Sequence, residues 1–227
     1  MTNSQLKEQA VTAIKICCIS SIEEAALALR LGATALGLVS EMPSGPGVIA
    51  EELIAEIVVT VPRTVSTFLL TSSTSAPDII AQQKRCGVNT VQLCDRLSME
   101  IYPELRSALP GVSLVQVVHI TGEESVAEAL QVAHSVDLLL LDSGDQSLQV
   151  KELGGTGRTH DWALSAQIVR ESTIPVFLAG GLDAENVGEA IRAVRPFGVD
   201  LCSGVRSSGT LSERKLRNFI EAVRATD

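Results

Sequence analysis

Three glycine-bearing segments of the sequence have the composition of loops that hold a phosphate. They read GGTG at 154–157, AGG at 179–181 and SGV at 203–205, and the last two directly follow apolar runs. Glycine lets backbone N–H groups approach an anion closely, and the N-terminus of a following helix adds a favourable dipole. One such segment alone would be better explained as a tight turn. Their repetition favours phosphate binding, and the residues expected to provide it are Gly155, Gly157, Gly180, Gly181, Ser203 and Gly204.

A carboxylate lies upstream of the first of these segments. Asp142 closes the apolar run VDLLLL (136–141), and the polar stretch SGDQSLQVKEL separates it from GGTG. That stretch is long enough to fold over a site as a lid. An Asp that follows an apolar strand is more often a helix cap or turn former, so the residue types by themselves leave its role open.

The cysteines and histidines lack the spacing of a metal site or a disulfide framework. The chain has five cysteines, an odd number, and three histidines; it contains no CxxC motif. Cys17 and Cys18 are adjacent, and consecutive strand residues point to opposite faces of a sheet, so a disulfide between them is not expected. The sequence therefore predicts reduced cysteines and no metal site.

Short apolar runs alternate with amphipathic segments along the whole chain. The apolar runs lie at 13–19, 33–40, 64–70, 89–93, 112–120, 136–141, 174–179 and 198–203. The helical patterns lie at 21–32, 50–61, 76–87, 98–109, 122–134, 161–172, 183–194 and 211–225. In the first of these, Ser20 with Glu23 or Ser21 with Glu24 fits a capping box, and Gly32 fits the helix end.

Such alternation of strands and helices indicates a parallel sheet. Eight units in 227 residues predict an α/β protein with a single-domain (β/α)8 TIM barrel over residues 1–227, with 1–12 as an N-terminal extension. A doubly wound open sheet is the alternative, which the count of eight and the lack of a linker disfavour. Pro103 within the fourth helical pattern fits least well. Because barrel enzymes work at the C-terminal ends of their strands, the site is expected among residues 17–20, 40–47, 70–73, 94–95, 119–121, 142–143, 180–181 and 203–206.

Charge and hydropathy exclude several classes of protein. The formal net charge is −9 at pH 7 and no block of basic residues occurs, so nucleic acid and anionic membranes are poor partners. No apolar run approaches the roughly 20 residues of a membrane span, and the polar N-terminus lacks the apolar core of a signal peptide. We expect a cytoplasmic protein in which local donors hold an anionic small-molecule substrate.

From Lys15 onward the sequence resembles the phosphoribosylanthranilate isomerase family of tryptophan biosynthesis. The segments that carry the resemblance are KIC (15–17), VQL (91–93), LLLD (139–142), GGTGRTHDW (154–162), FLAGGLDAENVGEAI (177–191) and FGVDLCSGV (197–205). Each segment alone would be weak, but their spaced combination is specific and spans nearly the whole chain.

The resemblance implies an Amadori-type rearrangement. The family opens the ribose ring of an N-linked phosphoribosyl amine and converts an aminoaldose into an aminoketose, with one acid and one base and without a cofactor. By resemblance, Asp142 is the general acid that protonates the ring oxygen, and Cys17 is the general base that removes the C2 proton.

Several positions depart from the family pattern. The loop after the second strand normally carries Ser-Pro-Arg, whose arginine pairs with the anthranilate carboxylate, but Gly47 stands at that position here. The glycine that normally follows the first cysteine is replaced by Cys18. His160 replaces the usual aromatic residue before Asp-Trp, and we expect it to be a surface residue at a helix start.

Two further departures concern the rim that would receive the aglycone. The fourth strand normally ends Leu-His-Gly but here continues into Cys94 and Asp95, and the last motif ends in Arg206 in place of glutamate. Arg206 could supply the missing positive charge, or it could be a solvated surface residue. Asp95 would repel an acidic aglycone, which favours a different substrate.

Three functions are therefore compatible with the sequence. The first is conversion of N-(5-phosphoribosyl)anthranilate to the 1-deoxyribulose 5-phosphate aminoketose by a monomer or homodimer. The second is an isomerase or lyase of the same family that acts on a different phosphorylated sugar. The third is a non-catalytic phosphometabolite-binding paralogue, against which the retention of Cys17 and Asp142 speaks.

Overall fold

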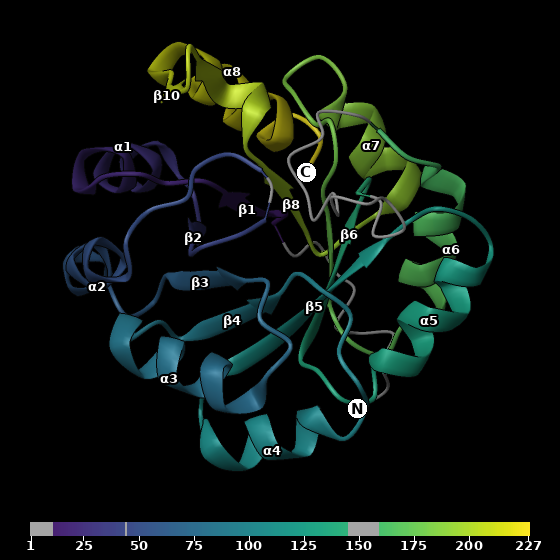
Figure 1. Ribbon diagram of the computed structural model, residues 1–227. Helices are drawn as coiled ribbons and strands as arrows, with labels where there is room; N and C mark the ends of the chain where they lie inside the picture. Colours follow the sequence, from purple (N-terminus) through teal and green to yellow (C-terminus); the bar gives the residue numbers. More distant parts are fainter. Residues whose placement is uncertain (1–10, 44, 145–158) are drawn as a thin grey trace.

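The protein is a closed barrel of eight parallel strands surrounded by helices (Figure 1). The computed structural model describes residues 11–43, 45–144 and 159–227. Each strand pairs with the next in sequence order, and β8 pairs with β1 to close the sheet. This confirms the predicted (β/α)8 TIM barrel, and the closed sheet excludes the open doubly wound alternative.

The strands and helices alternate without interruption up to β8. The barrel strands are β1 (Ala13–Ile16), β2 (Ala35–Val39), β3 (Ser66–Thr71), β4 (Thr90–Leu93), β5 (Ser113–His119), β6 (Leu138–Asp142), β7 (Val176–Leu178) and β8 (Gly198–Leu201). The helices are α1 (Ile22–Leu31), α2 (Glu51–Thr60), α3 (Ala76–Cys86), α4 (Ile101–Ala108), α5 (Glu124–Val132), α6 (Trp162–Glu171), α7 (Val187–Val194) and α8 (Glu213–Arg224).

Local sequence signals account for the ends of several helices. Ser21 caps α1, because its side chain accepts a hydrogen bond from the backbone N–H of Glu24 at 3.2 Å. Gly32 ends the same helix in the left-handed conformation, with φ of 113°. Pro103 is the third residue of α4, where its missing N–H has no intrahelical acceptor to lose, so the helix tolerates it.

The chain after β8 contains a hairpin that the strand–helix pattern did not predict. A 3₁₀ turn, Ser203–Val205, leads into β9 (Arg206–Ser207) and β10 (Thr210–Leu211), which pair antiparallel. Ser208 and Gly209 join them with φ of 50° and 81°, the left-handed pair typical of a tight two-residue hairpin. The hairpin shortens the expected last helix, which begins at Glu213.

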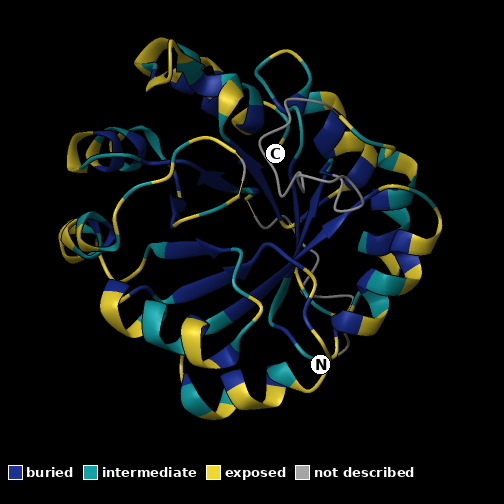
Figure 2. Ribbon diagram, in the orientation of Figure 1, coloured by how far each residue is buried: buried dark blue, intermediate teal, exposed yellow. Residues whose placement is uncertain are grey.

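The barrel strands are almost wholly buried (Figure 2), and their apolar residues form two clusters, one layer on each side of the barrel wall. The larger layer packs the outer face of the strands against the helices and includes Ile14 and Ile16 of β1. The smaller layer fills the barrel interior with residues of the opposite parity, such as Phe68, Val115 and Phe177. Strands buried on both faces explain why their sequences read as nearly continuous apolar runs.

One ion pair lies inside the barrel. Lys15 Nζ is 2.8 Å from Asp200 Oδ2 and 5.0 Å from the centre of the Phe68 ring, and the Lys15 side chain is fully buried. Burial would lower the pKa of Lys15, but attraction to the Asp200 carboxylate, and then to the Cys17 thiol, outweighs burial and raises it. Removing one partner of such a pair would leave a buried charge at a cost of about 3–5 kcal/mol.

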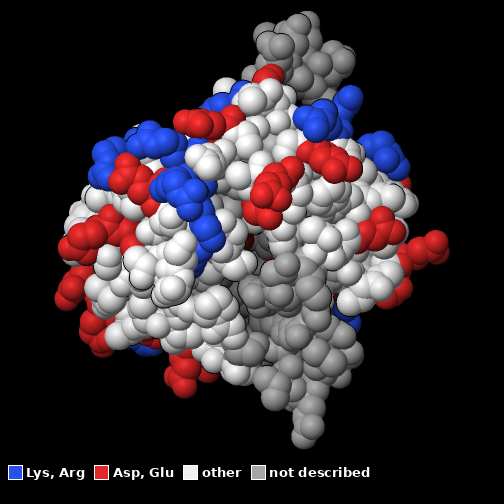
Figure 3. Space-filling view, turned by 90° about the horizontal axis from the view of Figure 1, so that it is seen from above, with Lys and Arg blue, Asp and Glu red and all other residues white. Residues whose placement is uncertain are grey.

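The surface carries charges of both signs. On the face shown in Figure 3, several basic side chains adjoin on one side, with acidic side chains beside them and over the rest of the face. Among the described residues, no helix combines the length and apolar character that a membrane crossing requires.

Candidate active site

The inward-facing residues at the C-terminal ends of the strands converge on one mouth of the barrel. Cys17 follows β1 and Asp142 ends β6, and both are buried. The backbone N–H of Cys17 donates to the carbonyl of Leu201 at 2.9 Å, which extends the β1–β8 ladder by one residue. In a closed barrel, β7 and β8 lie between these two strands, so the proposed base and acid flank the glycine-bearing loops.

The carboxylate of Asp142 is held on one side. Its Oδ1 accepts hydrogen bonds from the backbone N–H of Ser143 at 2.7 Å and from the Ser143 hydroxyl at 3.4 Å. A methyl group added to Gly180 would lie 3.1 Å from this same oxygen. Asp142 is therefore fixed at the strand end, against the loop that follows β7.

The loops after β7 and β8 present backbone donors. Gly180 and Gly181 adopt φ of 85° and 62°, which favour glycine. Gly204 approaches the carbonyl oxygen of Leu182 so closely that an added Cβ would lie 2.2 Å from it. Within the described part of the chain, no acceptor takes the backbone N–H groups of Gly180, Gly181, Ser203 and Gly204. Free N–H groups on neighbouring strand ends are what an anion site requires.

The other predicted phosphate contacts, Gly155 and Gly157, lie outside the described residues. The same holds for most of the stretch at 143–153 that the sequence suggested as a lid. Asn186 holds the loop that follows β7. Its amide nitrogen donates to the Gly181 carbonyl at 2.8 Å, and its amide oxygen accepts from Asp183 N at 3.0 Å.

Cys94 and Asp95 lie on the opposite rim, after β4. Burial raises the pKa of Cys94 to about 12, so it is a neutral thiol, and its sulfur lies 3.6 Å from Gln92 Nε2. Asp95 is buried, and its Oδ1 accepts from the backbone N–H of Arg96 at 2.8 Å. A thiol and a carboxylate thus stand where the family pattern has an imidazole and a glycine.

Cys18 and Gly47 are packed directly against one another. A Cβ added to Gly47 would lie 2.4 Å from Cys18 Cβ and 3.1 Å from its sulfur. Cys18 has φ of 62°, so the chain turns at the end of β1 and both cysteines belong to the inner apolar layer. The expectation that the two side chains point to opposite faces of the sheet is therefore wrong, because the left-handed residue Cys18 breaks the strand alternation. The two departures from the family pattern are physically coupled, since Cys18 leaves room only for glycine at position 47.

Arg206 is bound within the protein. Its guanidinium nitrogens lie 3.0 Å from each carboxylate oxygen of Glu24 and donate to the carbonyls of Gly209, at 2.9 Å, and of Cys18. The Arg206 side chain is only 9% exposed, so it is not a solvated surface charge. Burial would raise the pKa of Glu24, but the hydrogen bonds from Arg206 and from the backbone N–H groups of Leu211 and Ser20 together outweigh burial and lower that pKa. The arrangement ties the β8 loop to α1.

Four polar residues in and below the mouth were given no role from the sequence, although His119 lies at one of the strand ends where the site was expected. Lys15 and Asp200 form the ion pair one layer below Cys17, while His119 and His160 approach Asp142 from β5 and from the segment before α6. His160 is half-buried and binds the Ser165 hydroxyl at 2.7 Å, so it is not simply a surface residue. A polar residue at the inward parity of a strand is the signal that could have identified Lys15, His119 and Asp200.

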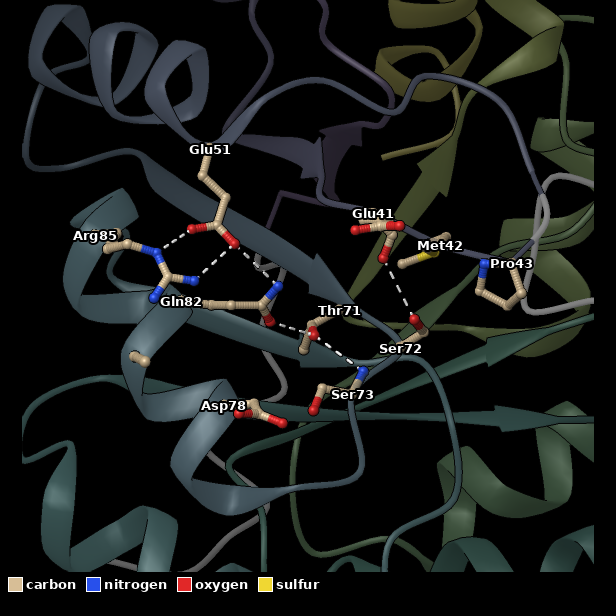
Figure 4. A pocket seen from close by; sticks show the side chains of 11 residues that line it. Glu41, Met42, Pro43, Glu51, Thr71, Ser72, Ser73, Asp78, Gln82 and Arg85 are labelled. Atoms are coloured by element: carbon tan, nitrogen blue, oxygen red, sulfur yellow. Dashed lines mark hydrogen bonds and ion pairs between the residues drawn. The ribbon is translucent and has the colours of Figure 1, made fainter.

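A second cleft of about 610 Å³ lies between the ends of β2 and β3 and the helices α2 and α3 (Figure 4). Glu51 binds Arg85 and also accepts from Gln82 Nε2 at 3.2 Å, while Gln82 Oε1 accepts from the Thr71 hydroxyl at 2.6 Å. The cationic group in this cleft is thus already neutralised. Among the described residues, no group of three or more His, Cys, Asp or Glu is placed to hold a metal ion.

Comparisons with known proteins agree on one family. The family model described as N-(5'-phosphoribosyl)anthranilate isomerase matches residues 14–222. The N-(5'-phosphoribosyl)anthranilate isomerase 2 of Methanosarcina mazei is 37% identical, over 91% of this chain and 92% of its own length. The corresponding isomerase of Nostoc punctiforme is 34% identical, over 92% and 96%.

Solved structures give the same result. The crystal structure of the Thermotoga maritima phosphoribosylanthranilate isomerase superposes with a TM-score of 0.81 and 28% identity, and it covers 94% of this chain and 99% of that one. A second isomerase structure, in complex with reduced 1-(o-carboxyphenylamino)-1-deoxyribulose 5-phosphate, superposes with a TM-score of 0.79 and 26% identity over the same shares. The barrel with its glycine loops, together with these matches, shows that the chain belongs to the N-(5'-phosphoribosyl)anthranilate isomerase family.

Proposed function

We propose that the protein converts N-(5-phosphoribosyl)anthranilate to 1-(o-carboxyphenylamino)-1-deoxyribulose 5-phosphate. The family membership and the bound ligand of the related isomerase support this substrate. The observation that carries the proposal is the position of Cys17 and Asp142 on either side of loops whose backbone N–H groups have no acceptor among the described residues.

The phosphate binds to the N–H groups after β7 and β8. Gly180, Gly181, Ser203 and Gly204 contribute these donors, and Gly155 and Gly157 are proposed to add to them. Backbone donors suit a phosphate because they carry partial positive charge without the desolvation cost of a buried cation. With its phosphate there, the ribose lies across the mouth, between the ends of β1 and β6.

Asp142 protonates the ring oxygen of the ribose, so the bond from that oxygen to C1 breaks and a Schiff base forms at C1. Cys17 then takes the proton from C2, whose acidity the adjacent iminium increases. The electron pair left on C2 forms the enolamine, which tautomerises to the aminoketose. Ser143 holds one oxygen of Asp142, so the other oxygen is available to the sugar.

Turnover of phosphoribosylanthranilate generated in situ, followed by its fluorescence decay, tests this function. Wild type should be active, and Cys17→Ala and Asp142→Asn should each lower kcat by roughly 10²–10⁴-fold. The controls are Cys86→Ala, buried on α3, and Asp137→Asn, just before β6 and far from the mouth. Absence of wild-type turnover would refute the function, and activity that survives Asp142→Asn would refute the assigned acid.

A different phosphorylated sugar remains the second candidate, and Asp95 is the observation that favours it. A buried carboxylate on the aglycone rim disfavours an acidic aglycone. Activity on a neutral N-phenyl phosphoribosylamine but not on phosphoribosylanthranilate would select this alternative. We also propose that the protein is a monomer or a homodimer in the cytoplasm; a dimeric form is described for the Thermotoga maritima isomerase.

A further inference from the structure

His119 is a buried histidine whose ring makes no hydrogen bond. Its side chain belongs to the mouth of the barrel, the residue is 8% exposed, and neither ring nitrogen has a hydrogen-bond partner in the described structure. A buried polar group without a partner costs about 1–3 kcal/mol, and such groups in native proteins call for an explanation.

The backbone of His119 is fixed while its ring is left free. Its carbonyl accepts from the Ser125 hydroxyl at 3.0 Å, and the next residue, Ile120, donates its N–H to the carbonyl of Asp142 at 2.9 Å. The strand end is therefore held rigidly on both sides. A ring that stays unpaired on a rigid strand end is available to a group that acts in the site.

The strand register places His119 next to Asp142. The two residues are partners in the β5–β6 ladder. Both follow inward-facing residues at the same parity, Val117 on β5 and Leu140 on β6, which belong to the inner apolar layer. Side chains of paired residues on neighbouring strands point to the same face, so the imidazole and the carboxylate lie side by side at the mouth.

The charged and titratable groups around this pair come from several elements. Asp142, Asp95 and Glu128 face His119, and Glu128 is itself paired with Arg96. The Cys94 backbone lies close enough to influence the ring, although without hydrogen-bond geometry. Asp142 in turn is approached by His160 and by the buried carboxylate of Asp200, which is paired with Lys15.

These surroundings set the charge state of His119. Burial lowers the pKa of His119, and attraction to Asp142 only partly opposes it. The ring is therefore neutral at neutral pH, with one N–H donor and one acceptor nitrogen. Because three carboxylates lie near the ring, this part of the mouth would repel a substrate carboxylate. It suits instead a neutral ring that donates a hydrogen bond to Asp142.

We propose that His119 is the positioning residue of Asp142, which holds its carboxylate after proton transfer and returns the proton that restores the acid. This inference rests on the proposed function. When Asp142 gives its proton to the ring oxygen, it is left as a carboxylate, and the His119 N–H donates to it. The proton from C2 goes to Cys17, which releases it to solvent to become a base again, so each turnover leaves Asp142 one proton short. His119 takes a proton from solvent on its free nitrogen and releases its other N–H proton to Asp142. The ring is left neutral as its other tautomer, and proton exchange with water restores the first.

His119→Ala and His119→Gln test this role, with His134→Gln, at an exposed histidine, as the control. His119→Ala should lower kcat roughly 10- to 100-fold, the effect typical of residues that orient a reactive group through hydrogen bonds, with KM within about twofold of wild type. Added imidazole should restore part of the activity of His119→Ala. His119→Gln keeps an N–H donor but cannot relay a proton, so its kcat should also fall.

The pH profile separates this role from a structural one. A donor to the carboxylate favours its ionised form, so its removal favours the protonated acid. The alkaline limb of kcat should therefore move to higher pH in His119→Ala. A higher KM with unchanged kcat would instead make His119 a substrate contact. A change in melting temperature alone, without imidazole rescue, would reduce it to a packing residue, and either result overturns the proposal.

An arm without substrate distinguishes failure of this inference from failure of the proposed function. NMR titration of the His119 ring in wild type and in Asp142→Asn measures their coupling directly. Because the Asp142 carboxylate favours the imidazolium form, the pKa of His119 should fall in Asp142→Asn. If wild type does not turn over phosphoribosylanthranilate, the proposed function is refuted, and the titration still shows whether His119 and Asp142 interact. An unchanged His119 titration overturns it.

Discussion

The two sides of the barrel mouth present different kinds of polar groups. After β7 and β8 the donors are backbone N–H groups, and the glycines are required by left-handed φ values or by close packing, as at Gly180 and Gly204. On the rim of β2 and β4 the family pattern relies on side chains, and there Gly47, Cys94 and Asp95 replace them. Backbone donors cannot be lost by a change of side chain, whereas side-chain contacts can.

Arginines take a structural role on both sides. Arg206 binds Glu24 beside the β8 loop, and Arg85 binds Glu51 beside the β3 end. Neither guanidinium is free to neutralise a ligand while these pairs persist. The backbone N–H groups after β7 and β8 are then the donors left for an anionic group, and the opposite rim offers no comparable set among the described residues.

The largest effect is expected from an arginine at position 47, on the rim where the family pattern uses side chains. Gly47→Arg should destabilise the fold by about 4 kcal/mol, because φ of 82° is strained for a side chain and the new Cβ meets Cys18. Cys18→Gly removes that clash, so the double variant should recover part of the loss and bind phosphoribosylanthranilate with a lower KM. Urea unfolding of the wild type, both single variants and the double variant gives the coupling energy. Strictly additive effects would show that the two positions are independent.

Breaking the Glu24–Arg206 pair tests whether the loop after β8 depends on its attachment to α1. Glu24→Gln should cost about 3 kcal/mol at pH 7, near the low end for a broken buried pair. The folded pKa of Glu24 is below its ordinary value of 4.5, so this contribution is complete above pH 4.5 and is lost as pH falls through the lowered value. In thermal unfolding, the difference in melting temperature between wild type and Glu24→Gln should be smaller at pH 3 than at pH 7.

Glu213→Gln is the matched control for that anchor. Its pair with Arg217 is exposed, so its loss should cost less than about 1 kcal/mol and depend little on pH. Equal losses from both variants would mean that the buried pair does not anchor the β8 loop.

The phosphate side can be weakened by one methyl group. Gly180→Ala places a Cβ at φ of 85°, 3.0 Å from the Ser143 hydroxyl and 3.1 Å from Asp142 Oδ1, so the loop must shift. The KM for the substrate and the Ki for inorganic phosphate should rise about tenfold, a loss of about 1.4 kcal/mol. Gly87→Ala has similar backbone strain, with φ of 68° and open space around the new Cβ, and should change only stability. Equal kinetic constants for the two variants would remove Gly180 from the phosphate site.

The smallest effect is expected at Asp95. If anthranilate binds near this rim, Asp95→Asn should lower KM about threefold, because a repulsion across a solvated rim is worth less than about 1 kcal/mol. Glu104→Gln, exposed on α4, is the control for a simple change in net charge. A higher KM in Asp95→Asn would instead make this carboxylate a substrate ligand and would favour the alternative substrate.

Much of the fold was predictable because its signals are local. Apolar runs and helical patterns of the right length gave the eight units in order, and Ser21 and Gly32 mark the ends of α1 as expected. The β9–β10 hairpin was missed because its strands are two residues long and carry no periodicity. The left-handed turn at Cys18 was missed because a non-glycine residue seldom adopts it.

The sequence by itself determined the barrel, the family and the residues at the strand ends, because strand–helix alternation and spaced motifs are written along the chain. Only the tertiary structure decided which side chains meet. It brings His119 against Asp142 through the β5–β6 register, Lys15 against Asp200 through β1–β8, and Glu24 against Arg206 across 182 positions of sequence. Such contacts depend on barrel closure, because it sets the register of neighbouring strands and so decides which side chains meet.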